Sequence, residues 1–323
     1  MTHRLIRDVF LHHFDNDMLR GLSDSAALGS CPGEILFTTD SYVVDPVFFP
    51  GGDIGKLAVC GTVNDLAVAG ANAAFLSAGF IIEEGVDMEQ LERIAASMAH
   101  EAKKAGVQIV TGDTKVVNKG KADKVFINTA GIGFVHPGFA HLSSPGSIQP
   151  GDRIVVNGNL GDHGVAVLAA REELNFSSGV PSDCASLNIL IGEALKSVSG
   201  VRFMRDLTRG GLATVLCEIA SGTDYGIDLE EEGLPVDEPV RGACEMLGLD
   251  PLYLANEGKF IAVVEKSQAE KLLKVMQADP LGRQAVVIGE ITETHPGRVV
   301  MNTQIGGRRV IEMLTGEQLP RIC

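Results

Sequence analysis

Four aspartates fall in the stretch from Thr38 to Ala71, TTDSYVVDPVFFPGGDIGKLAVCGTVNDLAVAGA. Asp40 ends a β-rich run, a loop rich in proline and glycine carries Asp45 and Asp53, and a helix-like segment carries Asn64-Asp65. Carboxylates at element ends can converge without being buried as bare charges, and such a cluster suits Mg²⁺ completed by substrate phosphates. The plainer alternative is that Asp53 caps a helix, Asp40 forms a turn and Asp65 is solvated.

A second segment whose side chains could bind a metal or a phosphate is Gly112-Asp113-Thr114-Lys115, at the bend of a strand-like run. A carboxylate and a lysine two residues apart can hold a metal and a phosphate oxygen together, with the lysine acting as a compact positive charge. A solvated turn is the alternative interpretation.

Two further candidates lie in the second half of the chain. Arg205-Asp206-Leu207-Thr208-Arg209-Gly210-Gly211 precedes an apolar helix-like run, and Glu257-Gly258-Lys259 precedes a strand-like run. Backbone N–H groups at a glycine-bearing helix start attract anions, and Asp206 could add a metal ligand. An ordinary capped helix remains the alternative for the first of these segments.

The composition narrows the class of protein. The chain has 323 residues, 45% apolar and 21% charged, enough for two domains that each bury a core. A formal charge of −15 disfavours nucleic-acid partners, which are bound through a surplus of lysine and arginine. No apolar run is long enough to span a membrane and the first residues are charged throughout, so we expect a cytoplasmic protein without a signal peptide.

Periodicity predicts the elements that must position these residues. Residues 136–151, with three prolines and three glycines, predict a domain boundary. We expect an irregular loop over 16–33 and a helix that opens near Asp162, with Asp162 as its N-cap and His163 on its surface. The other expected helices are 4–14, 88–106, 185–197, 237–247 and 266–277, and the expected strands include 75–82, 108–117, 125–135, 153–158 and 286–291.

The cysteines indicate neither a disulfide framework nor a zinc site, because the six lie far apart with no CxxC pair. Cys323 differs from the others because it is the last residue. About eight extended residues span roughly 26 Å, so a C-terminal tail could carry this thiol into a cleft. Pro320 would stiffen the approach. A tail end that merely finishes in cysteine is the plain alternative.

Taken in order, these motifs resemble one known family. The Thr38–Ala71 stretch, VTGDTKVV, GDHG, RDLTRGG, ANEGK and the terminal PRIC closely resemble the HypE family, the carbamoyl dehydratases of [NiFe]-hydrogenase maturation. The likeness runs from about residue 34 to the last residue, and the terminal PRIC separates this family from its fold relatives. Those relatives are ATP enzymes related to aminoimidazole ribonucleotide synthetase, including selenophosphate synthetase and thiamine-monophosphate kinase.

The resemblance implies a two-domain PurM-like α/β fold with mixed sheets flanked by helices. It implies an ATP-binding and dimerisation domain over 1–140, an α/β domain over 150–312 and a mobile tail over 313–323 that carries Cys323. It also implies a homodimer in which N-terminal strands of both subunits form a barrel. The family's glycine-rich segment ahead of the first helix has no counterpart before Arg4.

The same resemblance implies ATP bound through Mg²⁺ and assigns roles to the candidate residues. We expect four metal ligands, Asp40, Asp65, Asp113 and Asp206. The expected nucleotide-binding residues are these four with Asn64, Thr114, Lys115, Thr208, Arg209 and Gly210.

In the expected reaction, a carbamoyl group delivered by HypF is attached to the sulfur of Cys323 and its oxygen attacks the γ-phosphate of ATP. Lys115 offsets charge, Glu257 removes N–H protons and Lys259 holds phosphate, so that a thiocyanate remains. The cyano group then passes to HypC and HypD and becomes an iron ligand. The alternatives are a small-molecule ATP-dependent kinase or synthetase of the same fold, and a non-enzymatic scaffold for hydrogenase assembly.

Overall fold

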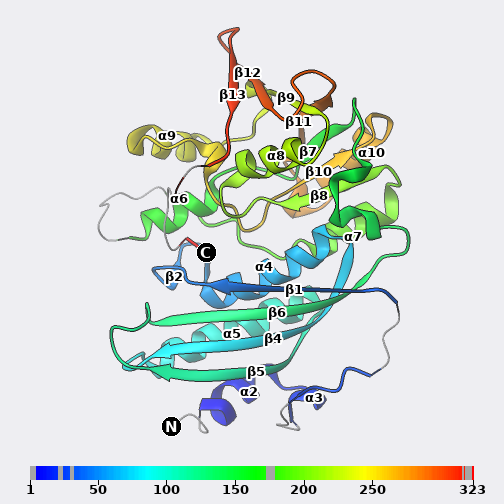
Figure 1. The fold of residues 1–323 in the computed structure, drawn as a ribbon. Coiled ribbons are helices and arrows are strands. Elements are labelled where there is room, and N and C mark those ends of the chain that lie inside the picture. Colours follow the sequence, from blue (N-terminus) through cyan, green and yellow to red (C-terminus); the bar gives the residue numbers. More distant parts are fainter. Residues whose placement is uncertain (1–4, 21–24, 30–32, 172–178, 315, 317–321) are drawn as a thin grey trace.

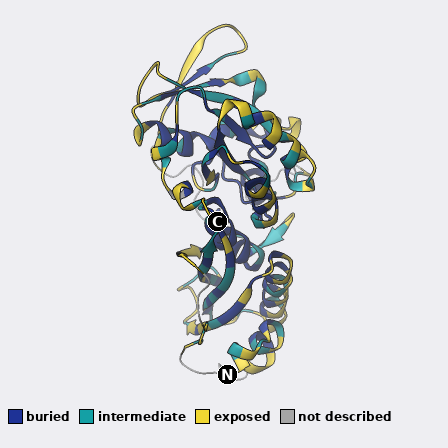
Figure 2. Cartoon of the chain, turned by 90° about the vertical axis from the view of Figure 1, so that its right-hand side faces the viewer, coloured by how far each residue is buried: buried dark blue, intermediate teal, exposed yellow. Residues whose placement is uncertain are grey.

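Two sheets, one in each half of the chain, form two lobes (Figure 1). The computed structural model describes residues 5–20, 25–29, 33–171, 179–314, 316 and 322–323. Cys323 lies at the waist between the lobes, as Figure 2 shows from the side. Within these residues, no helix is long and apolar enough to cross a membrane.

The first sheet has four strands in the order β1-β6-β4-β5, with only the β4–β5 pair parallel. Two helices pack on one of its faces. One is apolar all round and almost completely buried, whereas the other is amphipathic and ends at Gly106, whose φ of 75° forms the expected C-cap. The elements are β1 (Ile35–Tyr42), α4 (Ile54–Val68), β4 (Ala71–Glu83), α5 (Met88–Ala105), β5 (Gln108–Val117) and β6 (Val125–Val135).

The opposite face of this sheet is apolar and open. Phe37 is 68% exposed, Ile35 is 45% exposed and Ile81 is 43% exposed. No described element of the chain covers them, and the edge strands β1 and β5 have no further strand beside them among the described residues. A face of this kind indicates an interface.

The second sheet has seven strands in the order β13-β12-β9-β11-β7-β10-β8 and is also mixed, because β12 and β9 run parallel. Alternate residues of β10 (Phe260–Val264) pack in opposite directions. Phe260 and Ala262 contact the core formed with α7 and α10, and Ile261 and Val263 contact the core formed with α8. The mixed α/β fold predicted from the sequence is confirmed.

The remaining elements complete the second lobe and its links to the first. They are β7 (Arg153–Val156), α6 (Asp162–Ala169), α7 (Asn188–Ser197), β8 (Val201–Asp206), α8 (Gly211–Ser221), β9 (Gly226–Glu230), α9 (Glu238–Leu247), α10 (Ala269–Gln277), β11 (Val286–Thr292), β12 (Val299–Asn302) and β13 (Arg308–Ile311), with β2 (Phe48–Phe49) and β3 (Gly52–Asp53) in the first lobe. Short 3-10 turns connect several of them.

The chain before the first sheet differs from the expectation in detail. A π-helix, η1 (Ile6–Phe10), and α2 (Leu11–Phe14) occupy the predicted first helix. The predicted loop over 16–33 contains a helix, α3 (Asp17–Arg20), in which Arg20 pairs with Asp17 three residues earlier. Local ion pairs favour this turn although the segment has no apolar period.

Helix α4 joins the two lobes. Ala67 and Val68 pack into a core that also contains Leu142 and Leu190 of the second half. The side chain of Asn64, from the same helix, donates to Ala185 O at 3.0 Å and accepts from Leu187 N at 2.8 Å. The cleft between the lobes is therefore built on a shared helix.

Candidate functional site

Three of the predicted acidic residues lie together where the two lobes face each other. Asp40 is on β1, Asp65 is on α4, and Asp206 ends β8. Thr38 Oγ1 donates a hydrogen bond of 2.9 Å to Asp65 Oδ2. Burial raises the pKa of Asp206 to about 7, and the nearby charges of Asp65 and Asp40 add to that rise. Burial and Asp40 also raise the pKa of Asp65.

These carboxylates fit a hard cation that brings its own ligands. No three His, Cys, Asp or Glu side chains within the described ranges are arranged to hold a metal ion alone. Mg²⁺ requires only one or two carboxylates and completes its shell with water and phosphate. A cation beside Asp40, Asp65 and Asp206 would offset the repulsion that, after burial, adds to the raised pKa values of Asp65 and Asp206.

A cavity of about 470 Å³ opens beside the carboxylates, between β1 and α4 on one side and β8 and α8 on the other. Its volume lies in the range of small-molecule sites. Polar residues line it, including Thr38, Asp65, Asp206, Thr208 and Arg209.

Two glycines stand at the start of α8, between the lining residues Arg209 and Thr214. Gly210 has φ +76° and Gly211 has φ +58°, a conformation that residues with a Cβ rarely adopt. A Cβ on Gly211 would also lie 2.5 Å from Leu254 O. The pair therefore lets α8 begin against the 252–254 segment. The N–H group of Gly211 donates to Thr208 O at 3.0 Å.

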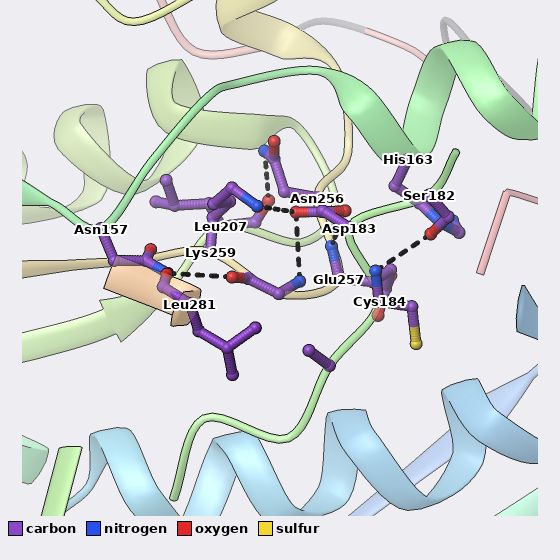
Figure 3. A network of polar contacts seen from close by, with 12 residues as sticks. Asn157, His163, Ser182, Asp183, Cys184, Leu207, Asn256, Glu257, Lys259 and Leu281 are labelled. Atoms are coloured by element: carbon purple, nitrogen blue, oxygen red, sulfur yellow. Dashed lines mark hydrogen bonds and ion pairs between the residues drawn. The ribbon is translucent and has the colours of Figure 1, made fainter. Parts of the chain in front are cut away.

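Glu257 lies in the segment just before β10, as the sequence predicts, within a network of polar contacts that includes Asp183 and Lys259 (Figure 3). It is buried, and its Oε1 has no hydrogen-bond partner among the described residues. Burial raises its pKa well above the usual range, and Asp183, Asp206 and Asp40 raise it further. The side chain is therefore held as a protonated acid, or as a strong base once ionised.

Asp183, which the sequence analysis did not identify, holds the Glu257 segment in place. Its carboxylate accepts from Glu257 N at 3.0 Å and Gly258 N at 3.2 Å, and it pairs with Lys259 Nζ at 2.9 Å (Figure 3). Burial would raise its pKa, but the charge of Lys259 and the backbone hydrogen bond from Glu257 outweigh that effect and lower it. Lys259 is thus engaged by a buried carboxylate.

Asn64 also binds the segment that contains Glu257. Besides its bonds to Ala185 and Leu187, its side-chain amide donates to Glu257 O at 3.4 Å. Because both ends of the amide are engaged within the protein, the structure gives Asn64 a positioning role where we expected nucleotide contact.

The C-terminal residue is docked in this cleft. Burial raises the pKa of the Cys323 thiol to about 12, Glu257 adds to the rise, and Arg209 opposes it. The backbone of Val43, just beyond β1, donates to Cys323 O at 3.2 Å. The terminal sulfur therefore lies beside Glu257 and Arg209, next to the acidic group. Pro320 and Arg321 of the PRIC motif lie outside the described residues.

His163 and Asp162 differ from their predicted roles. His163 is fully buried and not on the surface, because the tail and the 181–184 segment cover the start of α6. Gly161, with φ +88°, is the N-cap of α6, so Asp162 is not. Burial raises the pKa of Asp162 to about 7, and burial lowers that of His163.

Asp113 does not reach the other three aspartates within one chain. It lies on β5, and β4 and β6 separate β5 from β1. The register aligns Asp113 with Ser41 across these strands. Three interstrand steps of about 4.8 Å put it about 14 Å from β1. The predicted four-carboxylate cluster is therefore wrong for a single chain, because strand order in the sheet does not follow sequence order.

The neighbours of Asp113 share its exposed position. Lys115 Nζ lies 2.9 Å from Asp113 Oδ2, and both side chains are largely exposed. Thr114 is buried on the other face of the strand.

The remaining two aspartates of the Thr38–Ala71 stretch lie outside the acidic group. Asp53 caps α4 by accepting from Gly55 N and Lys56 N, which confirms the plain interpretation, and Asp45 lies in the loop before β2.

Comparisons with known proteins agree with this geometry. Family models of AIR synthase related proteins match residues 23–135 (N-terminal domain) and 149–302 (C-terminal domain). Carbamoyl dehydratase HypE of Rhodobacter capsulatus is 52% identical over 324 residues, covering 99% of this chain and 94% of the relative.

Two crystal structures extend the comparison. Hydrogenase maturation protein HypE in complex with ATP matches with a TM-score of 0.94 at 50% identity, covering 100% of this chain and 96% of that one. A HypE–HypF complex matches with a TM-score of 0.83 at 49% identity, covering 96% and 99%. With an AIR synthase-related fold, carboxylates gathered at its cleft and a match over nearly the whole length of HypE relatives, the chain belongs to the HypE family of carbamoyl dehydratases.

Proposed function

We propose that this enzyme uses ATP to dehydrate a carbamoyl group carried on the sulfur of Cys323, which leaves a thiocyanate. The observation that carries the proposal is the docked terminal residue, whose thiol lies beside Glu257 and Arg209. A small-molecule kinase of the same fold has no need of a protein thiol at that position, and a scaffold has no need of a buried acid.

The cavity between β1, α4, β8 and α8 is our proposed ATP site, supported by the relative that was crystallised with ATP. Thr208, Arg209 and the N–H groups at Gly210 would contact the phosphates. Asp40, Asp65 and Asp206 would hold Mg²⁺ there, which when bound offsets the negative charge of the transferred phosphoryl group.

The reaction follows in two balanced steps. The carbamoyl oxygen on Cys323 attacks the γ-phosphate, which gives ADP and an O-phosphorylated group after loss of one N–H proton. Glu257 then takes the remaining N–H proton while the C–O bond breaks and phosphate leaves, so that the C–N bond becomes triple. Overall, the sulfur-bound group loses one water and ATP becomes ADP and phosphate.

The residues around Glu257 position this base. Asp183 fixes its backbone N–H, and Asn64 and Ala185 contact its carbonyl. Lys259, held by Asp183, would stabilise the departing phosphate from the other side of the segment. The unpartnered Oε1 is free to accept a proton from the substrate nitrogen.

The proposed partners handle the group before and after dehydration. HypF would supply the carbamoyl group, which the HypE–HypF complex of a relative supports. The HypC and HypD complex would accept the cyano group for the hydrogenase iron. Both exchanges would require Cys323 to leave the cleft, because it is partly buried there against the core of the first lobe.

We also propose a homodimer built on the open face of the first sheet. Its exposed Phe37, Ile35 and Ile81 would be covered by the same face of a second copy. Pairing of the edge strands β1 and β5 between subunits would bring the partner's Asp113, Thr114 and Lys115 to the β1 edge, where Asp40 lies. This arrangement reconciles the predicted four-carboxylate site with the single chain.

Mass spectrometry tests the reaction. The enzyme is first loaded by HypF and then given Mg-ATP, and its C-terminal peptide is weighed. We expect that peptide to lose the mass of one water, while Cys323→Ala acquires no modification at all. An unchanged mass in the loaded wild-type protein would contradict the proposal.

Glu257→Gln separates the two steps. The variant keeps the shape of the side chain and lacks the base, so it should release ADP while forming the dehydrated peptide at least about a hundredfold more slowly. Asp224→Asn, a change at an exposed residue that does not line the cavity, is the control and should behave as wild type. Equal dehydration by the Glu257 variant would remove that residue from the mechanism.

A further inference from the structure

A chain of hydrogen bonds links the second domain to the docked C-terminus. His163 lies at the start of α6, and its two ring nitrogens contact different segments. Nδ1 lies 2.8 Å from Ser182 Oγ, and Nε2 lies 2.8 Å from Ile322 O. The ring also stacks edge-on against Phe49, with centroids 5.4 Å apart.

The groups at the two ends of this hydrogen-bond network determine which atoms donate and which accept. The Ile322 carbonyl can only accept, so Nε2 carries the proton, and in the neutral ring Nδ1 then accepts from the Ser182 hydroxyl. Ser182 Oγ in turn accepts from Cys184 N at 3.1 Å. Burial lowers the pKa of His163, which favours the neutral ring that this arrangement requires.

The same end of the tail is held from the first domain. Val43 N donates to Cys323 O, and the Ile322 side chain is 6% exposed in the core that contains Phe49. The carbonyl of Ile322 is thus bound by the second lobe, and the terminal carboxylate of Cys323 is bound by the first lobe. Neither contact involves the Cys323 sulfur.

We propose that His163 is a positioning residue that docks the tail by its main chain, with Ser182 setting its tautomer. Because it binds the Ile322 carbonyl and not the sulfur, it retains the tail equally whether the thiol is free, carbamoylated or cyanated. The inference rests on the proposed function, and it adds the residue that sets how long the loaded sulfur stays beside Glu257.

Loss of this contact should shift the tail toward the undocked state. A net hydrogen bond changes an equilibrium by about fivefold, and more when the abandoned carbonyl stays buried. An undocked Cys323 would lose the burial and the Glu257 charge that raise its thiol pKa, so it would react with alkylating reagents far faster.

Alkylation of the unloaded enzyme without ATP tests the docking directly. Iodoacetamide is added, and the modified C-terminal peptide is followed over time by mass spectrometry. His163→Phe keeps the ring volume and removes the donor, so Cys323 should be alkylated at least about fivefold faster than in wild type. His163→Gln retains a donor near the Nε2 position and should restore most of the protection. Cys217, half-buried and outside the cleft, is the internal control and should react at an unchanged rate.

Ser182→Ala provides a second variant if His163→Phe fails to fold. It leaves the imidazole in place without the partner that orients its proton, so Cys323 should again be alkylated faster, by a smaller factor. Equal Cys323 reactivity in all of these proteins would overturn the proposal.

Comparison of the alkylation rate with the dehydration rate distinguishes the role of His163 from the proposed function. In preloaded His163→Phe, dehydration should also slow, because a smaller fraction of the tails is docked, while the affinity for Mg-ATP stays unchanged. The product of this factor and the factor by which alkylation accelerates should equal the change in the ratio of docked to undocked tail. If Cys323 is alkylated faster but loaded wild type forms no dehydrated product, docking stands and the proposed reaction fails. If product forms while alkylation rates stay equal, the reaction stands and the His163 role fails.

Discussion

At the scale of single residues, the cleft is defined by acids kept where their charged forms are unfavourable. Glu257 has an unpartnered oxygen, and Asp206 lies buried beside Asp65. In both, burial is the first cause of the raised pKa. Such groups lower the stability of the folded protein when they are ionised. Proteins retain them at sites that bind a cation or transfer a proton.

Ionisation of Asp206 should make the stability of the folded protein depend on pH. A carboxyl with a pKa raised to about 7 binds its proton more tightly in the folded than in the unfolded protein, so its contribution to stability falls as pH rises from about 4 to about 7 and is then constant. Asp206→Asn lacks this titration. The free energy of unfolding of the variant minus that of wild type should therefore rise across this window, by at most about 4 kcal/mol.

Urea unfolding at steps of pH, without Mg²⁺ or nucleotide, measures this difference. Asp224→Asn changes the same group at an exposed position and serves as the control. A difference that stays flat for Asp206→Asn would show that its carboxyl is not strained in the free enzyme.

The residue types revealed most of this acidic group but not its supports. Asp40, Asp65 and Asp206 could be predicted because each lies at or near the C-terminal end of a recognisable strand or helix. His163 and Asp183 could not, since their partners lie far away in sequence. The only local signal was the Gly-Asp-His-Gly motif, which looks like an ordinary helix start.

At the scale of elements, the wall of the cavity depends on how α8 begins. Gly211 has a positive φ, and its Cα faces backbone carbonyls of the 252–254 segment. The same segment leads directly to Glu257. The start of α8 and the position of the buried acid are therefore coupled through one close backbone contact.

Gly211→Ala should break this coupling. The added methyl meets Leu254 O at a φ that alanine avoids, so the free energy of unfolding should fall by at least about 2 kcal/mol, with weaker binding of ATP. Gly192→Ala is the matched control, because Gly192 lies inside α7 with open space around it. That change should raise stability by up to about 1 kcal/mol without affecting ATP. Thermal unfolding and nucleotide titration measure both. Equal effects of the two substitutions would exclude a special role for the α8 start.

Periodicity predicted the elements better than their arrangement. The α5 helix with its glycine cap and the strands β5 and β6 follow from local pattern. The order β1-β6-β4-β5 does not, because β4 pairs with both β5 and β6 through contacts distant in sequence. That order is what separates Asp113 from Asp40, and no spacing along the chain encodes it.

At the scale of the whole molecule, the cleft is bounded by both lobes while the first sheet remains incomplete. Its apolar face is open, its edge strands are unpaired within the described chain, and Asp113 with Lys115 lies exposed on the edge farthest from Asp40. One arrangement accounts for all three features. A second copy would cover the face, pair the edges and carry its own Asp113 toward the first copy's Asp40.

Mixed dimers test this arrangement. Asp40→Asn and Asp113→Asn should each be inactive alone, because every site then lacks one carboxylate. After subunit exchange in an equal mixture, half of the dimers are hybrids, and one of the two sites in each hybrid has both carboxylates. Dehydration should therefore return to about one quarter of the wild-type rate. Mixing Asp40→Asn with Asp40→Asn,Asp113→Asn is the control and should stay inactive, since no site regains Asp40. If the two single variants also stay inactive after proven exchange, Asp40 and Asp113 would have to serve the same subunit, and the site would not be shared.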